Sequence, residues 1–326
     1  MLAALLLVIA LPSPAAAAAA AAAPATAEQQ HRQLVTEGFT VVRNVLSPAR
    51  LAEIRRVSHE LVASNETAHL QEDKFTGSLI PVSKDAAFAA LISDATAIAA
   101  LESVGATHMK WMSGFVISKP PHTPSLGWHQ DGWYWEDEQA AYGQPAAQLF
   151  AMYYLTDTSV QNGCLRVLPG THRKEHELHS QLGKAHSGEV RSGQNSRWQD
   201  KPEHRDVEGE SVAVPVQAGD MVIGDARVLH GAFPNQSDER RTVITIWYTA
   251  SNQSAGFLDG VAQLHLHQCG ELYTGWDAAA MEKMKPLLPD PRGLSTTDRP
   301  EMSEEFNHNL GFMRRTPQWA GSKGEL

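Results

Sequence analysis

The sequence predicts a mainly β fold with flanking helices, in which antiparallel strands form a sandwich or barrel such as a jelly roll. From residue 111 onward, short apolar or alternating segments are separated by turn signals, a pattern typical of these folds. Before residue 111, apolar residues recur at helical spacing instead. The chain has 326 residues, of which 42% are hydrophobic and 20% charged, so it is long enough to bury a sizeable core.

Residues 1–29 have a composition of their own. An apolar run over residues 2–11 precedes an alanine tract, and this run is too short to span a bilayer. The run is typical of a secretory signal, and the alanines offer cleavage sites, but no Lys or Arg precedes it. We therefore expect either a signal peptide with a secretory location, or a low-complexity extension or misassigned start with a cytoplasmic one. Residues 30–326 show no repeat and no second boundary, so we expect one domain there.

The first half of this domain is predicted to be largely helical. A short strand over residues 39–42 is followed by a helix that begins with Ser47 at the N-cap and Pro48 at the first helical position. Apolar residues continue this helix at the expected spacing, namely Leu51, Ile54, Val57 and Leu61. Residues 85–102 predict a further helix with an alanine-rich apolar face.

Strands dominate the second half. The segments that predict them are 111–119, 148–158, 163–172, 211–225 (two short strands), 227–235 and 241–249. We expect the last two to pair as a hairpin through the polar turn at 235–240. Residues 173–210 are polar and show no period, which predicts a long loop of the kind that is usually functional or mobile and could serve as a lid over a site. The loop's irregularly spaced histidines are not expected to bind a metal; they are His176, His179, His186 and His204.

The chemistry is concentrated in "GWHQDGWYW" (127–135), where one residue separates His129 from Asp131. Side chains at i and i+2 of an extended strand point to the same face, so this imidazole and this carboxylate converge. His230 ends an apolar segment and supplies a third ligand. Two histidines and one carboxylate on one face of a metal are the ligand set of non-haem Fe(II) oxygenases. Taken singly, the two histidines are also explained as satisfied strand residues, and Asp131 as a turn cap.

A cation for a dicarboxylate co-substrate is expected at the start of the last strand. The predicted hairpin brings Arg241 beside His230, and a guanidinium binds a carboxylate through two parallel hydrogen bonds. The neighbouring Arg240 points to the opposite face, and the alternation along the strand does not decide which of the two faces inward. Arg241 as a surface charge on an edge strand is the simpler alternative.

The ordered motifs "ISKPP" (117–121), "HQD" (129–131), "NGCLRVLPGTH" (162–172) and "LHGAFPNQSDERRTVITIWY" (229–248) resemble those of the phytanoyl-CoA dioxygenase family of Fe(II)- and 2-oxoglutarate-dependent oxygenases, over roughly residues 30–250. The resemblance implies a double-stranded β-helix core, of the jelly-roll or cupin-like type. It also implies iron ligands at His129, Asp131 and His230, and 2-oxoglutarate contacts from Arg241 and Gln130.

Two positions refine what the resemblance implies. Ala232 stands where the family has a small hydroxyl residue, which removes one expected contact to the co-substrate. Asp131 is the carboxylate that related halogenases lack, so its presence favours oxygen transfer over halogenation. Trp111 and Trp128 are expected in the core, whereas Trp133 and Trp135 are better placed to line a substrate pocket.

The expected function is a dioxygenase that uses Fe(II), 2-oxoglutarate and O2 to hydroxylate a small organic substrate, with release of succinate and CO2. The alternatives are a cupin-like non-redox metal protein and a pseudoenzyme on the same fold.

A net charge of −10 with no basic run argues against nucleic acid as a partner. No segment predicts a stable membrane span. No pattern in the sequence indicates the oligomeric state or the identity of the substrate. Cys164 and Cys269 are expected as free, mostly buried thiols, with a single bridge between them as the alternative, and His265 and His267 are expected as structural histidines.

Overall fold

A computed structural model describes residues 25–64, 78–134, 137–182, 207, 209–265 and 276–290. Most of the signal-like segment, the larger part of the 173–210 loop, Trp135, His267 and Cys269 therefore lie outside the described residues. The strands are β1 (Phe39–Val42), β2 (Ile80–Pro81), β3 (Met109–Lys119), β4 (Leu126–His129), β5 (Gln148–Tyr154), β6 (Leu165–Val167), β7 (Val212–Val214), β8 (Met221–Asp225), β9 (His230–Ala232) and β10 (Arg241–Ala250). The helices are α2 (Ala27–Glu37), α3 (Pro48–Ser64), the 3-10 turn η1 (Val82–Lys84), α5 (Ala86–Ile92), α6 (Ala95–Ser103), α7 (Glu138–Tyr142), α8 (Glu177–Gln181), α10 (Ala255–His265) and α11 (Ala278–Met284).

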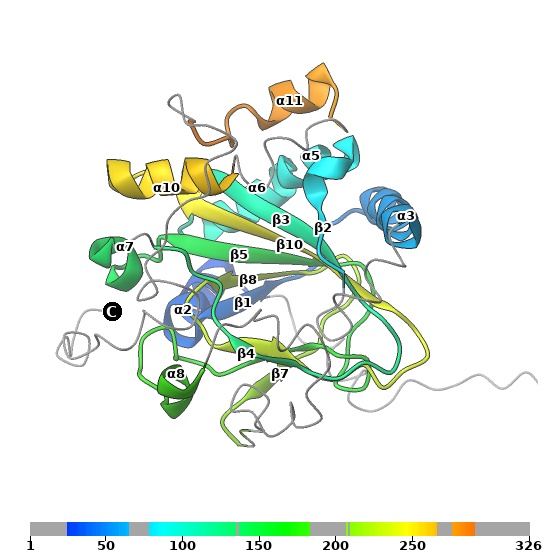
Figure 1. Cartoon of the computed structure of the whole chain (residues 1–326), viewed down its shortest axis with the longest axis horizontal. Coiled ribbons are helices and arrows are strands. Elements are labelled where there is room, and N and C mark those ends of the chain that lie inside the picture. The colour runs from blue at the N-terminus through cyan, green and yellow to red at the C-terminus, as the bar shows by residue number, and fades with distance from the viewer. Residues whose placement is uncertain are drawn as a thin grey trace, which may run out of the picture.

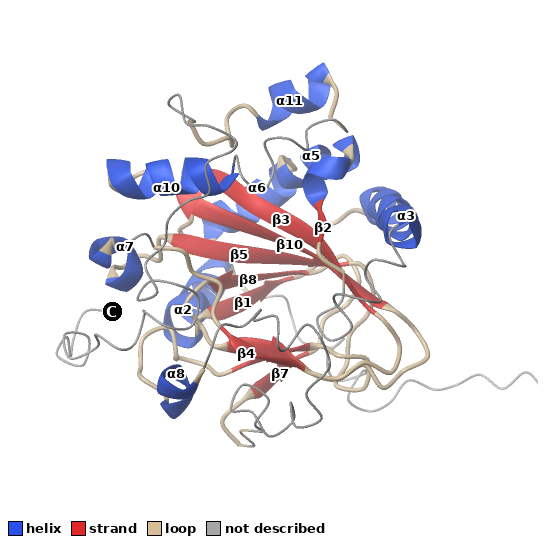
Figure 2. Cartoon of the chain, viewed as in Figure 1, coloured by secondary structure: helices blue, strands red, loops and turns tan. Residues whose placement is uncertain are grey.

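The strands form two antiparallel sheets that face each other as a jelly roll (Figures 1 and 2). The larger sheet has six strands in the order β1-β8-β5-β10-β3-β2, and the smaller has four in the order β4-β9-β6-β7. Helices α3, α5, α6 and α11 lie on the side of the larger sheet that faces away from the smaller one (Figure 1). The fold is the mainly β architecture with flanking helices that the sequence predicts.

Strand β5 contributes side chains to the apolar clusters on both faces of the larger sheet. All seven of its residues are buried, so it does not show the half-polar alternation of a surface strand. Leu149, Ala151 and Tyr153 belong to the apolar cluster beneath the helices. Phe150, Met152 and Tyr154 point the other way, into the cluster between the two sheets. The larger sheet is therefore covered on both faces, and its inner face forms one wall of the space where a site can lie.

Helix α3 starts as predicted, and α2 precedes it near the beginning of the described residues. The Ser47 hydroxyl accepts a hydrogen bond from the backbone N–H of Arg50, so Ser47 caps α3. Helix α2 begins at Ala27, three residues before the predicted start of the domain at residue 30. Thr26 and Gln29 form a reciprocal capping box that starts this helix at the edge of the alanine-rich segment.

The single helix predicted over residues 85–102 is two helices in the structure. The Asp94 carboxylate accepts from the backbone N–H groups of Thr96 and Ala97, which ends α5 and starts α6. By length and composition, residues 86–103 are the one stretch of the described chain apolar enough to cross a membrane. Here their buried side chains pack in the cluster beneath the helices, as core helices do.

The hairpin predicted between residues 227–235 and 241–249 is wrong. Strand β9 pairs with β4 and β6 in the smaller sheet, whereas β10 pairs with β3 and β5 in the larger one. The segment between them crosses from one sheet to the other, and the Asn235 side chain holds it by donating to the backbone carbonyls of Pro120 and Glu239. Both edges of the three-residue β9 are already paired, so β10 has no free edge to join.

The loop predicted over residues 173–210 contains a helix near its start. Helix α8 places Leu178, and Leu182 just after it, four residues apart on one face. Both side chains are buried in a small cluster with Trp128 and Leu229, on the outer side of the smaller sheet. His179, which the sequence places in a solvated loop, is buried in the structure, and burial lowers the pKa of its imidazole to about 4.

Candidate metal centre

Three potential metal ligands meet where the smaller sheet faces the interior. His129 ends β4 and lies directly opposite His230, the first residue of β9. The Nε2 atom of His129 is 3.5 Å from Oδ1 of Asp131, and the Nε2 atom of His230 is 3.4 Å from Oδ2 of the same carboxylate. One ligand atom from each residue lies within 4.8 Å of the others, and all three side chains are buried. The structure therefore brings together the three residues that the sequence singles out.

Asp131 reaches this point in a different way from the one expected. Strand β4 ends at His129, so Asp131 lies just beyond the ladder and not on an extended strand. Its backbone N–H donates to the carbonyl oxygen of Ala226, over 2.7 Å, in the segment that leads into β9. The segment before β9 thus positions both Asp131 and His230.

The backbone also orients the two imidazole rings. Nδ1 of His129 lies 2.8 Å from the carbonyl oxygen of Gly127, and Nδ1 of His230 lies 3.1 Å from that of Val228. A carbonyl oxygen only accepts, so each Nδ1 carries the proton in the neutral ring and each Nε2 presents a lone pair. Both lone pairs face the Asp131 carboxylate. Orienting bonds of this kind are typical of histidines that bind a metal through the other nitrogen.

The electrostatics of the cluster call for a cation. Burial alone would raise the pKa of Asp131, but His230, His129 and the indole N–H of Trp247 together hold it well below its usual range. Burial opposes a charge on His230, yet the Asp131 charge raises the pKa of its imidazole. Two nitrogen lone pairs and a carboxylate buried together are costly unless something positive lies between them. The donor set, two imidazoles and one carboxylate, fits a divalent transition metal such as Fe(II).

The triad opens into a cavity of about 80 Å³ between the two sheets. Its polar lining comes from the triad itself, Arg241 and Thr245. The rest of the lining is mainly apolar or aromatic: Leu79, Ile117, Leu126, Met152, Tyr154, Leu165, Ala232, Val243 and Trp247. Along β10 the inward residues are Arg241, Val243, Thr245 and Trp247, so the strand supplies one complete wall.

Arg241 faces this cavity and Arg240 does not. The Arg241 side chain is buried, its Nε atom makes no hydrogen bond, and no acidic partner is found for it in the described ranges. Burial lowers the pKa of its guanidinium. Arg240 is half-buried and donates to the carbonyl oxygen of Ser118. A buried cation without an anion, beside a set of metal ligands, is suited to bind a carboxylate.

Two residues near the site were missed from sequence. Lys119 is fully buried directly opposite Arg241 in the pairing of β3 with β10, and its ammonium donates to the carbonyl oxygen of Pro124. Burial, followed by the charges of Arg241 and Arg166, lowers its pKa well below the ordinary value. The inward alternation of Phe115, Ile117 and Lys119 is a signal that could have identified it. The other missed residue, Trp247, hydrogen-bonds Asp131 from β10.

Other predicted residues have different surroundings. The Gln130 amide donates to the carbonyl oxygen of Arg227 and is not among the residues that line the cavity, so its contact with a co-substrate stays a prediction. Trp133 is buried against Trp247 and does not line the cavity either. His265 is buried, with Nδ1 2.9 Å from the carbonyl oxygen of Met112, as expected of a structural histidine.

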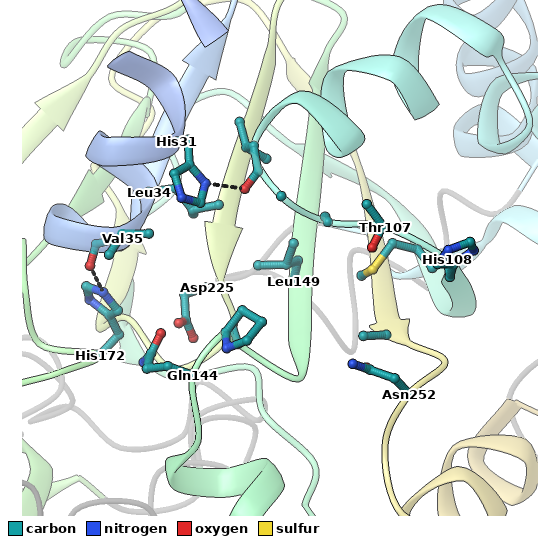
Figure 3. Close-up of a pocket in the computed structure, with 17 residues that line it drawn as sticks. His31, Leu34, Val35, Thr107, His108, Gln144, Leu149, His172, Asp225 and Asn252 are labelled. Atoms are coloured by element: carbon teal, nitrogen blue, oxygen red, sulfur yellow. Dashed lines mark hydrogen bonds between the residues drawn. The ribbon is translucent and has the colours of Figure 1, made fainter. Parts of the chain in front are cut away.

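A second cavity, of about 140 Å³, lies outside the space between the sheets (Figure 3). It is bounded by α2, by the segment before β3 and by Gln144 (Figure 3). His31 bonds the carbonyl oxygen of Val104, and His172 bonds that of Val35, so its histidines tie α2 to neighbouring segments. Within the described residues, the cluster with metal-ligand geometry is the triad, and none of its members lines this larger cavity.

Comparisons with known proteins agree with this geometry. The sequence profile of the family described as "Phytanoyl-CoA dioxygenase (PhyH)" matches residues 34–243. A probable alpha-ketoglutarate-dependent hypophosphite dioxygenase from Stutzerimonas stutzeri is 30% identical over 135 residues. That match covers 41% of this chain and 43% of the relative, so the chain spans less than half of the relative's length.

Solved structures share the fold at low sequence identity. AviO1 from Streptomyces viridochromogenes Tue57 superimposes with a TM-score of 0.51 at 20% identity, over 72% of this chain and 99% of that one. HygX from Streptomyces hygroscopicus, determined with nickel and 2-oxoglutarate bound, gives a TM-score of 0.51 at 16% identity, over 72% of this chain and 94% of that one. At such identities the likeness shows the fold.

Proposed function

This chain belongs to the phytanoyl-CoA dioxygenase (PhyH) family, and we propose that it is an Fe(II)- and 2-oxoglutarate-dependent dioxygenase that oxidises a small molecule. The expected products from the co-substrate are succinate and CO2, and hydroxylation is the expected outcome for the substrate. The observation that carries the proposal is the buried His129, Asp131 and His230 triad, which opens into the same cavity as the unpaired Arg241 cation.

Each residue has a distinct task in this proposal. His129, Asp131 and His230 hold the metal from one side, which leaves the positions on the cavity side for ligands. Arg241 binds the distal carboxylate of 2-oxoglutarate through its guanidinium. The apolar side chains around the cavity exclude water from the reacting groups. When bound, Fe(II) supplies the O2 activation that couples co-substrate decarboxylation to oxidation of the substrate.

The similar proteins support this assignment. The Stutzerimonas relative is named as a probable alpha-ketoglutarate-dependent dioxygenase, and HygX was determined with nickel and 2-oxoglutarate bound. The named substrate of that relative, hypophosphite, is small, and so is the described cavity of about 80 Å³. We therefore propose a small-molecule substrate, without a claim to its identity.

Succinate formation tests the proposal. The purified protein, supplied with Fe(II), ascorbate, 2-oxoglutarate and O2, should release succinate slowly without substrate and faster with the correct one. Asp131→Ala should abolish this release, because the metal loses a ligand. A protein that binds the metal but never releases succinate, against a panel of small molecules, would be the cupin-like binding protein or pseudoenzyme instead.

A further inference from the structure

We propose that Trp247 is a positioning residue for Asp131, and that its indole N–H fixes the carboxylate so that a metal binds through a single oxygen. The inference rests on the proposed function, because it concerns how the metal is held. It assigns a role to a residue that belongs neither to the ligand set nor to the co-substrate cation.

The contact between the two side chains is short and buried. Nε1 of Trp247 donates to Oδ2 of Asp131 over 2.9 Å, and both residues are less than a tenth exposed. Apart from the two histidines of the triad, Trp247 is the side chain that reaches this carboxylate in the described part of the chain. A hydrogen bond to an ionised acceptor in a dry interior is about twice as strong as a neutral one.

The sheet places the indole with little freedom. Trp247 points inward from β10, where the pairing with β3 shifts register between Trp247 and Tyr248. Trp247 is opposite Ser113 and Tyr248 is opposite Trp111, so Met112 has no opposite residue on β10. An irregularity of this kind re-aims a neighbouring side chain, and such bulges are frequent beside active sites.

Two aromatic rings hold the indole from its sides. Phe115 on β3 meets it edge-on with ring centroids 5.9 Å apart, and Trp133 does so at 6.2 Å. The ring is therefore fixed by packing, and its N–H direction is set before any metal binds. A preorganised outer group of this kind orients a metal ligand without reorganisation.

The hydrogen bond limits how the carboxylate can bind. Each carboxylate oxygen offers two lone pairs, and the indole occupies one of those on Oδ2. A hydrogen bond draws electron density from the oxygen that accepts it, so Oδ2 becomes the weaker donor to a metal and the indole favours binding through Oδ1. One-oxygen binding keeps the remaining positions of the metal open for the co-substrate and O2.

If Trp247 only packed in the core, its substitution would lower stability without lowering metal affinity. The chain offers a matched control for this alternative. Trp111 on the neighbouring strand is also fully buried, and it stacks on Trp276 with centroids 5.3 Å apart. Its indole N–H makes no hydrogen bond in the described residues, and its side chain lies in the cluster beneath the helices. Trp111→Phe therefore removes as much buried indole as Trp247→Phe without touching the carboxylate.

The test is the affinity of the metal-free protein for Co(II), measured anaerobically by calorimetry, with urea unfolding of each variant alongside. We expect Trp247→Phe to weaken Co(II) binding by about 10- to 100-fold, the usual effect of losing a partner of a metal ligand. Trp111→Phe should destabilise the fold by a similar amount and leave Co(II) affinity unchanged. Equal Co(II) affinities for the two variants would overturn the inference.

Two further arms keep the result decisive. If Trp247→Phe fails to fold, 3-benzothienylalanine at position 247 keeps the ring's shape and lacks the N–H, so it should show the same loss of Co(II) affinity. The visible absorption spectrum of the Co(II) protein should also differ between the wild type and the variants that lack the indole N–H, because the coordination of the ion changes. Wild-type protein that binds no Co(II) would instead overturn the proposed function, and the inference with it.

Discussion

Two of the buried arginines of this barrel, Arg227 and Arg241, differ in how their charge is balanced. Arg227, in the segment between β8 and β9, forms two hydrogen bonds with Asp225 at 2.8 and 2.6 Å and donates to the carbonyl oxygens of Ala141 and Gly143. Arg241, at the start of β10, has no acidic partner in the described ranges and an unpaired Nε. The first charge is neutralised within the fold, and the second is left for a ligand.

The pKa values follow the same division. Burial disfavours the charge on both arginines, but the Asp225 carboxylate more than compensates and raises the pKa of Arg227. At Arg241 burial outweighs the opposing influence of Tyr154 and Cys164, and the pKa of its guanidinium is lowered. Arg227 also supports the site indirectly, because its carbonyl oxygen accepts from Gln130 and the adjacent Ala226 carbonyl accepts from the backbone of Asp131. Arg227 therefore positions the backbone around the site, whereas the Arg241 charge is available to bind a ligand.

The largest effect on stability is expected from the paired arginine. Arg227→Met leaves Asp225 as a buried, unpaired carboxylate, which should lower the free energy of unfolding by about 3–5 kcal/mol. Arg241→Met removes a buried cation that has no anion, so the same measurement should show little change or a gain. Urea denaturation of the metal-free protein gives both values, and the reverse ranking would refute the division drawn here.

Affinity for 2-oxoglutarate should rank the two variants in the opposite order, with the larger loss at Arg241. Arg241→Met leaves the distal carboxylate of 2-oxoglutarate buried without a partner, at a cost of about 2–5 kcal/mol. This corresponds to a roughly 30- to several-thousand-fold weaker affinity for 2-oxoglutarate. Arg241→Lys should restore part of it, because an ammonium cannot reproduce the two-bond clamp. Titration with succinate as the readout measures the change, and unaltered affinity in Arg241→Met would remove the co-substrate assignment.

The buried His265 should make the stability of the protein depend on pH. Burial lowers the pKa of His265 to about 4 from an ordinary value of 6.5, so the folded protein binds fewer protons than the unfolded chain between these two pH values. Stability should therefore fall as the pH is lowered from 6.5 to 4, by up to roughly 3 kcal/mol from this residue. His265→Gln should flatten this dependence in urea unfolding curves, and an equally steep curve would exclude the residue as its source.

The smallest effect is expected at Arg240. Its side chain is half-buried and donates to the backbone carbonyl oxygen of Ser118. Arg240→Ala should change the unfolding free energy by about 0.5 kcal/mol or less and leave 2-oxoglutarate affinity nearly unchanged. A large loss of co-substrate affinity in this variant, with Arg241→Met silent, would place the wrong arginine in the cavity.

The sequence was most informative where a pattern is local. Strand spacing and motif order identified His129, Asp131 and His230 as a group, and the structure brings them together. Turn and cap residues also located individual strands and the start of α3. The choice between Arg240 and Arg241 came from the family motif, because alternation along one strand does not reveal which face is the inner one.

Long-range pairing could not be read in the same way. The predicted hairpin failed because a strand's sequence does not specify its partner, and β9 and β10 belong to different sheets. The role of Trp247 depends on a register shift and on the position of Asp131 beyond its strand, and neither has a local signal. Helix α8 was missed because five residues are too few to show a period.

The most direct test of the account is an anaerobic crystal structure of the protein with Fe(II) and 2-oxoglutarate, with data collected at the iron absorption edge. The account predicts one anomalous peak about 2.0–2.2 Å from the ligating atoms of His129, Asp131 and His230. The distal carboxylate of 2-oxoglutarate should lie on the Arg241 guanidinium. Iron bound elsewhere, or an empty triad at saturating Fe(II), would contradict it.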